Sequence, residues 1–317
     1  MKKIWKCGLI GMLVFGLLTG CGSSPKNAAE NGESQDAAGQ KLFVCTSFYP
    51  MYDFAKKIGG DQIRLVNLVP SGTEPHDWEP SPQDLANLEK ADVFIYNGSG
   101  MEPWAEKILG ALQNEKLAVV EASQGINLLE GNHTRTEEVV EDETPYDPHV
   151  WLSPMKAKAE MKAIKEAIVQ ADPENKAMYE ANYQTYAAKF DALDQEFKDT
   201  LSPLPNKNII VAHQAFGYLC ADYGLKQVAI EGLSADAEPD PARMAEIIDF
   251  AKANSVKVIF FEELVSPKVA ESIASAIGAK TAVLNPLEGL NDQQLQAGSD
   301  YLSVMRENLQ ALKTALQ

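Results

Sequence analysis

The sequence predicts an α/β protein of two lobes, each a mostly parallel sheet flanked by helices, joined by one long rigid helix. Three observations lead to this fold class. A length of 317 residues suggests about two domains. Strand-type runs and helical patterns alternate in both halves of the chain, which is typical of parallel sheets with helical crossovers. Between the halves, a helical pattern runs from Pro173 to Leu201 without an internal Gly or Pro.

The elements of the first half are bounded by clear local signals. Gly59-Gly60 stops one helix, and Ser81-Pro82 supplies the N-cap and first residue of the next. Ser153-Pro154 starts another helix in the same way. The predicted strands are 41–48, 62–69, 92–96 and 117–120, and the predicted helices are 50–58, one from residue 82, 102–112 and 154–171.

The second half repeats this order of elements, although the two halves share no sequence repeat. Gly224 stops its first helix. The predicted strands are 208–212, 227–230, 257–261 and 281–284, and the predicted helices are 215–223, 246–253, 267–277 and 300–316. The segment 127–147 interrupts the pattern with a run of acidic residues and is predicted to be a solvated loop.

The long helix in the middle of the chain has two interpretations. About 28 residues would extend about 42 Å at 1.5 Å per residue, which suits a connector between lobes. The alternative is a long helix packed within one domain. With the connector, the expected organisation is a first lobe over 41–172, a connecting helix over 173–202 and a second lobe over 203–317.

The N-terminus has the features of an export signal. Three lysines precede an apolar run that is too short to span a bilayer, and the run ends in Leu18-Thr19-Gly20-Cys21. That tetrapeptide resembles a bacterial lipobox, so residues 1–20 are expected to be a lipoprotein signal peptide and Cys21 the lipidated residue. An ordinary secretory signal with a chance Cys is the alternative. Residues 21–40 are small and polar and are predicted to be a flexible tether to the membrane.

The charge balance limits the function classes. The net charge is −17, and removal of residues 1–20 takes away three lysines and no acidic residue, leaving −20. Nucleic-acid binding is excluded, because phosphate contacts need Lys and Arg. No CxxC pair is present. Cys45 and Cys220 are predicted to be buried apolar residues, with a disulfide between them left open.

Three of the four histidines occupy similar places. His76 and His213 follow predicted strands, and His149 precedes a helix cap. Ligands of open α/β sheets bind beyond the carboxyl ends of the strands, so these imidazoles could converge on one metal ion. A tetrahedral zinc site needs a fourth ligand, and Glu288 follows a late strand. The alternatives for this fourth position are Glu74, Glu231, Glu262 and Glu263.

Several motifs together resemble a known family. EPHDWEP, DPHVWLSP, AHQAFGYL, FFEE and VLNPLEGL are similar to motifs of the metal-binding solute receptors of ABC importers, which include zinc and manganese receptors and adhesin lipoproteins. The likeness covers residues 41–317 and is greatest to Gram-positive zinc-binding and laminin-binding lipoproteins. It implies two lobes joined by one helix, with one metal between them. It also implies ligands at His76, His149, His213 and Glu288.

The ligand types favour zinc over manganese. Manganese receptors of the family use two His and two carboxylates, whereas this chain has a third His at 213. Zinc accepts tetrahedral N/O sites, and manganese prefers more oxygen. Glu262 and Glu263 are expected to support the site rather than to bind the ion. Asp147 or Asp77 could orient an imidazole, and Trp78 and Trp151 are expected to pack on the cleft wall.

The expected function is that of an extracytoplasmic receptor, and not of an enzyme. The chain contains no HExxH or GxSxG motif. We expect a monomer on the outer side of a Gram-positive membrane that captures zinc and delivers it to an ABC permease with little lobe closure. Manganese transport and adhesion to host matrix such as laminin are the alternatives. His133, in the acidic loop, is expected to be merely solvated; a role in concentrating cations is the alternative.

Overall fold

Two parallel four-stranded sheets form the framework of the computed structural model, which describes residues 41–131, 145–233 and 239–317. Cys21 and His133 lie outside the described residues. The first sheet has the order β2-β1-β3-β4, and the second has the equivalent order β6-β5-β7-β8. The strands are β1 Leu42–Thr46, β2 Ile63–Asn67, β3 Val93–Tyr96, β4 Ala118–Glu121, β5 Asn208–Val211, β6 Lys226–Ala229, β7 Val258–Phe261 and β8 Lys280–Val283. The predicted fold class is confirmed.

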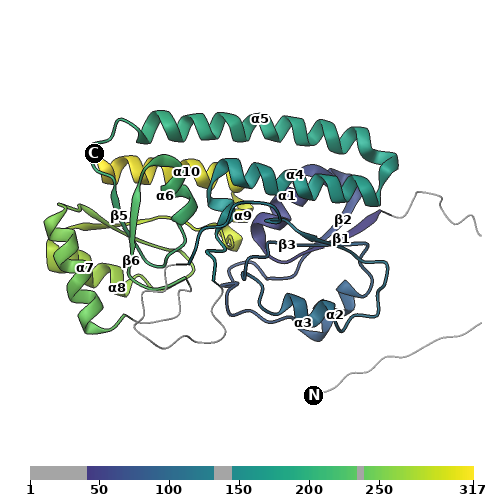
Figure 1. The fold of residues 1–317 in the computed structure, drawn as a ribbon, viewed down its shortest axis with the longest axis horizontal. Coiled ribbons are helices and arrows are strands. Elements are labelled where there is room, and N and C mark those ends of the chain that lie inside the picture. Colours follow the sequence, from purple (N-terminus) through teal and green to yellow (C-terminus); the bar gives the residue numbers. More distant parts are fainter. Residues whose placement is uncertain (1–40, 132–144, 234–238) are drawn as a thin grey trace, which may run out of the picture. The chain divides into compact units, whose positions relative to one another are not determined.

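Helices cover both sheets (Figure 1). The first sheet and its helices α1 to α4 make up the first lobe, and the second sheet with α6 to α10 makes up the second. The helices are α1 Tyr49–Gly59, α2 Pro82–Leu88, α3 Ala105–Leu109, α4 Pro154–Ala171, α5 Lys176–Leu201, α6 Gly217–Tyr223, α7 Pro241–Ala253, α8 Lys268–Ile277, α9 Asp292–Gln296 and α10 Tyr301–Leu316.

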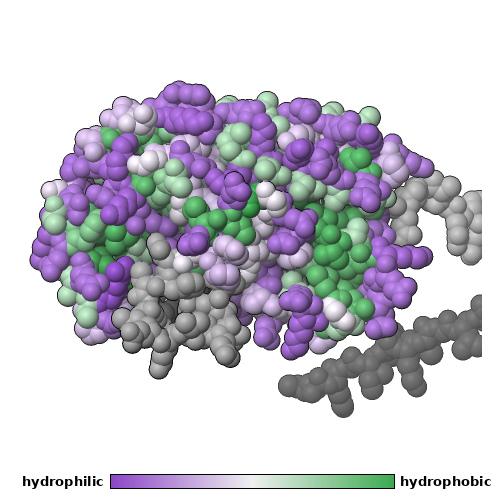
Figure 2. Space-filling view, viewed as in Figure 1, coloured by the Kyte–Doolittle hydropathy of each residue, from purple (hydrophilic) through white to green (hydrophobic). Residues whose placement is uncertain are grey.

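The long helix α5 connects the lobes, runs along one side of both and packs against both. It contacts α1 and α4 of the first lobe and α6 and α10 of the second. Its buried face, which includes Phe190, Leu193 and Phe197, belongs to one hydrophobic core that continues into both lobes. Figure 2 shows mostly hydrophilic side chains along its exposed side. A 3-10 turn over Pro173–Asn175 precedes the helix. Because α5 packs into a core that continues into both lobes, it is part of that core as well as a connector.

Several element boundaries differ from the prediction. Helix α7 begins at Pro241 rather than at residue 246, because the Asp240 carboxylate caps the N–H groups of Ala242 and Arg243. Helix α3 is shorter than predicted, because Glu102 bonds Ser47 and the loop after β3 instead of continuing a helix. Helix α9 was not predicted; a capping box between Asn291 and Gln294 forms it.

Both described cysteines are free and buried, Cys45 in β1 and Cys220 in α6. The predicted apolar role is therefore confirmed, and the disulfide between them is wrong. Burial raises the pKa of Cys45 to about 12, so its thiol stays protonated. Among the described helices, none is both long and apolar enough to cross a membrane.

Candidate metal centre

Four predicted ligands come together from four separate segments. His76 lies in the loop after β2, and His149 directly precedes the 3-10 turn Val150–Leu152. His213 follows the end of β5 after one intervening residue, and Glu288 lies between β8 and α9. One ligand atom from each residue lies within 4.8 Å of the others. Parallel strands end at one edge of their sheet, which explains why segments distant in sequence meet here.

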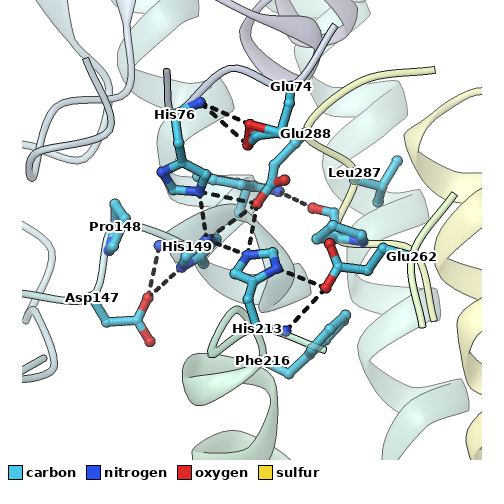
Figure 3. A network of polar contacts seen from close by, with 12 residues as sticks. Glu74, His76, Asp147, Pro148, His149, His213, Phe216, Glu262, Leu287 and Glu288 are labelled. Atoms are coloured by element: carbon cyan, nitrogen blue, oxygen red, sulfur yellow. Dashed lines mark hydrogen bonds and ion pairs between the residues drawn. The ribbon is translucent and has the colours of Figure 1, made fainter. Parts of the chain in front are cut away.

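Five of the six distances between these ligand atoms are nearly equal, and the sixth, between His76 and His213, is within 4.8 Å (Figure 3). The His149 Nε2 lies 3.3 Å from the His76 Nε2 and 3.2 Å from the His213 Nε2. The Glu288 Oε1 lies 3.4 Å from the His76 Nε2, and 3.2 Å from the Nε2 atoms of His149 and His213. In a tetrahedron with metal–ligand bonds of about 2.0–2.1 Å, ligand atoms are about 3.3–3.4 Å apart. The spacing therefore fits a small tetrahedral cation.

Two imidazoles are oriented by carboxylates on their far side. The His149 Nδ1 lies 2.8 Å from the Asp147 Oδ1, and the His213 Nδ1 lies 2.7 Å from the Glu262 Oε1. A carboxylate only accepts hydrogen bonds, so the neutral imidazole carries its proton on Nδ1. When both rings are neutral, their Nε2 lone pairs face each other at 3.2 Å with no proton between them. A cation bound between the two Nε2 atoms would remove the repulsion between their lone pairs.

Burial differs among the four ligand side chains. His149 and His213 are 0% exposed and Glu288 is 2% exposed. The His76 side chain is 10% exposed, and its backbone N–H donates to the Glu74 carboxylate. The site is therefore nearly closed, and His76 is the ligand nearest to solvent.

The electrostatic environment favours a positive charge at the ligand atoms. Burial lowers the pKa of His76. Burial acts on His213 too, but the carboxylates of Glu262 and Glu288 outweigh it and raise the pKa well above its usual range. Burial alone would raise the pKa of Glu288, yet the imidazoles, led by His213, hold it well below its usual range. The carboxylates thus stabilise positive charge where the ring nitrogens meet.

The alternatives for the fourth position do not join this cluster of ligand atoms. Among the described residues, the cluster contains Glu288 and none of Glu74, Glu231, Glu262 or Glu263. Glu262 instead accepts hydrogen bonds from the backbone and ring of His213, a position from which it can orient this ligand. Glu263 accepts from the side-chain amides of Asn285 and Gln294.

Of the two tryptophans beside the motifs, Trp151 packs next to a ligand as predicted, whereas Trp78 packs against Trp104 within the first lobe. Trp151 is fully buried, with its ring centroid 4.8 Å from Phe48 and 5.3 Å from His149. Trp78 stacks edge-on to Trp104 at 5.5 Å. Of the two candidate aspartates, Asp147 orients the His149 ring.

Sequence reasoning missed three hydrogen bonds that hold the ligand segments from behind. Tyr218 donates to the Asp147 carbonyl, and Tyr301 donates to the Trp151 carbonyl. Asn97 donates to the Pro148 carbonyl. A buried aromatic with a polar tip usually has a partner, but the sequence does not indicate which carbonyl it reaches.

Comparison with known families agrees with this geometry. The family described as "ZnuA: Zinc-uptake complex component A periplasmic" matches residues 44–315. The chain is 45% identical over 320 residues to the high-affinity zinc uptake system protein ZnuA of Bacillus subtilis, covering 100% of this chain and 99% of that protein. It is 42% identical over 286 residues to the zinc-binding lipoprotein AdcA of Streptococcus pneumoniae, covering 88% of this chain but only 57% of AdcA.

Solved structures show the same fold. The Zn(II)-bound ZnuA-like domain of Streptococcus pneumoniae AdcA superposes with a TM-score of 0.77 at 40% identity, covering 87% of this chain and 99% of the domain. The laminin-binding protein Lmb of Streptococcus agalactiae superposes with a TM-score of 0.79 at 34% identity, covering 88% of this chain and 100% of Lmb.

Proposed function

The chain belongs to the family of the zinc-uptake complex component A, and on this premise we propose that it is a zinc-binding receptor that delivers the ion to an ABC-type importer. One observation carries the proposal: three imidazole nitrogens and one carboxylate oxygen meet at tetrahedral spacing in a nearly closed site. The substrate is one Zn²⁺ ion between the lobes, with His76, His149, His213 and Glu288 as its ligands.

The donor set supports zinc rather than manganese. Three nitrogens and one oxygen suit the tetrahedral coordination of zinc, whereas manganese prefers more oxygen ligands and a higher coordination number. The short ligand-atom distances support a small, four-coordinate ion. A manganese receptor of the same family is the alternative.

The ion enters and leaves on the side of His76, the most exposed ligand. Docking on the permease opens the site, and the ion passes inward. We propose that the protein works outside the cytoplasm, held by lipid on Cys21; the relative AdcA is likewise described as a lipoprotein. This location suits a Gram-positive cell surface and a monomeric receptor.

The proposal includes no catalytic role. The matched family is described as a component of a zinc-uptake complex. A zinc hydrolase keeps an open coordination position for water, and the four protein ligands proposed here would fill a tetrahedral shell.

Metal analysis of the purified protein tests the proposal. The wild-type chain should hold one zinc per molecule, and manganese in excess should not displace it. His213→Asp replaces a nitrogen donor with oxygen, so it should weaken zinc binding more than manganese binding. A wild-type protein that binds manganese more tightly than zinc would refute the choice of ion, and Glu288→Ala with unaltered zinc affinity would refute the fourth ligand.

Adhesion to host matrix is a second candidate function, and the similarity to laminin-binding proteins favours it. Lmb of Streptococcus agalactiae is described as "a bifunctional protein with adhesin and metal transporting activity". Immobilised laminin is the appropriate probe. If Glu288→Ala abolishes zinc uptake and leaves laminin binding intact, the two functions are separate; if the wild-type protein does not bind laminin, adhesion is excluded.

A further inference from the structure

Two buried hydrogen bonds cross between the lobes and end beside the proposed ligands. The Tyr218 hydroxyl, on α6 of the second lobe, donates to the Asp147 carbonyl in the first lobe at 2.7 Å. The Trp151 indole N–H, in the first lobe, donates to the Pro286 carbonyl in the second at 2.7 Å. Each acceptor lies two residues before a ligand, His149 in one case and Glu288 in the other. Each lobe thus holds the segment that carries a ligand of the opposite lobe.

The Tyr218 contact belongs to a tightly packed corner. Its hydroxyl also accepts from the Leu129 N–H at 3.0 Å, so it links Leu129 to Asp147. The Asp147 carboxylate binds both the backbone N–H and the ring Nδ1 of His149 through Oδ1. Its other oxygen lies too close to Gly217 to leave room for a Cβ there, so the carboxylate packs directly against the backbone of α6. The position of His149 therefore depends on α6.

The Trp151 contact acts on a strained turn. Leu287 has a φ of +59°, a conformation that costs a non-glycine residue free energy and persists only where the surroundings enforce it. Its N–H donates to the Asn285 side chain at 2.7 Å, and Asn285 is in turn bound at both backbone groups by Asn308 of α10. The Trp151 indole holds the intervening Pro286 carbonyl from the other lobe. These bonds keep the turn in the shape that directs Glu288 toward the imidazoles (Figure 3).

We propose that Tyr218 and Trp151 are positioning residues, which hold His149 and Glu288 in the zinc-binding arrangement across the lobe boundary and thereby set the rate of zinc release. The inference rests on the proposed function. It implies that the ligand set is organised before the ion arrives, so little binding energy is spent on ordering it. A partner that separates the lobes breaks both bonds and withdraws both ligands from the ion.

Tyr218→Phe tests the proposal with the loss of a single oxygen. The matched control is Tyr223→Phe on the same helix, whose hydroxyl bonds Asp194 of α5 instead. We expect Tyr218→Phe to weaken zinc binding about tenfold to hundredfold, as loss of an outer-sphere partner typically does, and to speed zinc release to a chelator. The visible spectrum of the Co²⁺-loaded variant should also change, because it reports the geometry of the ligand set. Tyr223→Phe should match the wild type in all three.

Trp151→Phe tests the other bond, with Trp104→Phe as its control, because Trp104 is a buried tryptophan that packs against Trp78 and Phe94. Thermal unfolding of the metal-free variants separates loss of folding from loss of positioning. If Trp151→Phe does not fold, Tyr218→Phe decides the outcome.

The proposal is overturned if wild-type protein binds zinc while Tyr218→Phe keeps the release rate and Co²⁺ spectrum of Tyr223→Phe. A wild-type protein that binds no zinc would overturn the proposed function instead, so the two failures are distinguishable.

Discussion

The two sides of the candidate metal centre are built differently. On the inner side, His149 and His213 are fully buried, and each ring is held by a carboxylate at its Nδ1. On the outer side, His76 is partly exposed, and its contact with Glu74 runs through the backbone N–H. Rigid, carboxylate-backed ligands favour affinity, and a more exposed ligand favours exchange with solvent. Under the proposed function, we infer that the inner side would provide binding strength and the outer side the path for the ion.

Removal of an inner ligand should have the largest effect. Loss of a supporting residue typically weakens metal binding up to about hundredfold. His213→Ala should weaken zinc binding by more than this, because it removes a ligand and also the ring N–H that the buried Glu262 carboxylate accepts. His76→Ala should cost less, because water can reach the outer side and replace the imidazole. Zinc competition titrations of both variants check this. Equal losses would refute the distinction between the two sides.

Loss of the carboxylate behind His213 should have an intermediate effect. Glu262→Gln should weaken zinc binding about tenfold to hundredfold, because the ring loses a charged acceptor that fixes its tautomer. Glu263→Gln is the control, since the neighbouring carboxylate binds Asn285 and Gln294. The same titration measures both variants, and a Glu263→Gln loss as large as that of Glu262→Gln would contradict the assignment.

A buried carboxyl away from the ligands should affect stability and its pH dependence. Glu160 on α4 is fully buried, and neither of its oxygens has a hydrogen-bond partner among the described residues. Burial raises its pKa well above the usual range, and the Glu102 carboxyl adds to this. The folded state therefore keeps the proton, whereas the unfolded state loses it above about pH 4.3, so this group lowers stability as pH rises.

Glu160→Gln should remove this effect. The variant should be more stable than the wild type at pH 8, with a difference that shrinks toward pH 4, as measured by denaturant unfolding of the metal-free proteins. The control is Glu166→Gln on the same helix, because the Glu166 side chain is 58% exposed. A difference that is constant with pH would rule out a proton bound by Glu160.

The smallest expected effect is a change in the position of one lobe relative to the other when zinc binds. The core that α5 shares with both lobes should limit lobe movement when zinc binds. Hydrogen exchange with and without zinc should show added protection around residues 73–79, the outer side, and little change along α5. A large change in solution scattering on zinc binding would contradict this expectation.

The sequence alone was enough for the fold class and for the set of candidate ligands. Strand-to-helix alternation and the Ser-Pro and Gly-Gly boundaries depend on local chain chemistry, so the approximate positions of the strands and helices could be predicted. The histidines could be grouped because strand ends share an edge. Helix α9 and the true start of α7 were missed because their caps, Asn291 and Asp240, were not recognised as start signals.

The tertiary structure alone decided which atoms meet. Its place after a late strand favoured Glu288 but left Glu74, Glu231, Glu262 and Glu263 open, and only the packed chain shows that Glu288 joins the cluster. Which carboxylate backs which ring, and which carbonyls Tyr218 and Trp151 bind, depends on contacts between the lobes. Local pattern determines where strands and helices begin and end, whereas contacts between segments far apart in sequence arise only when the whole chain packs.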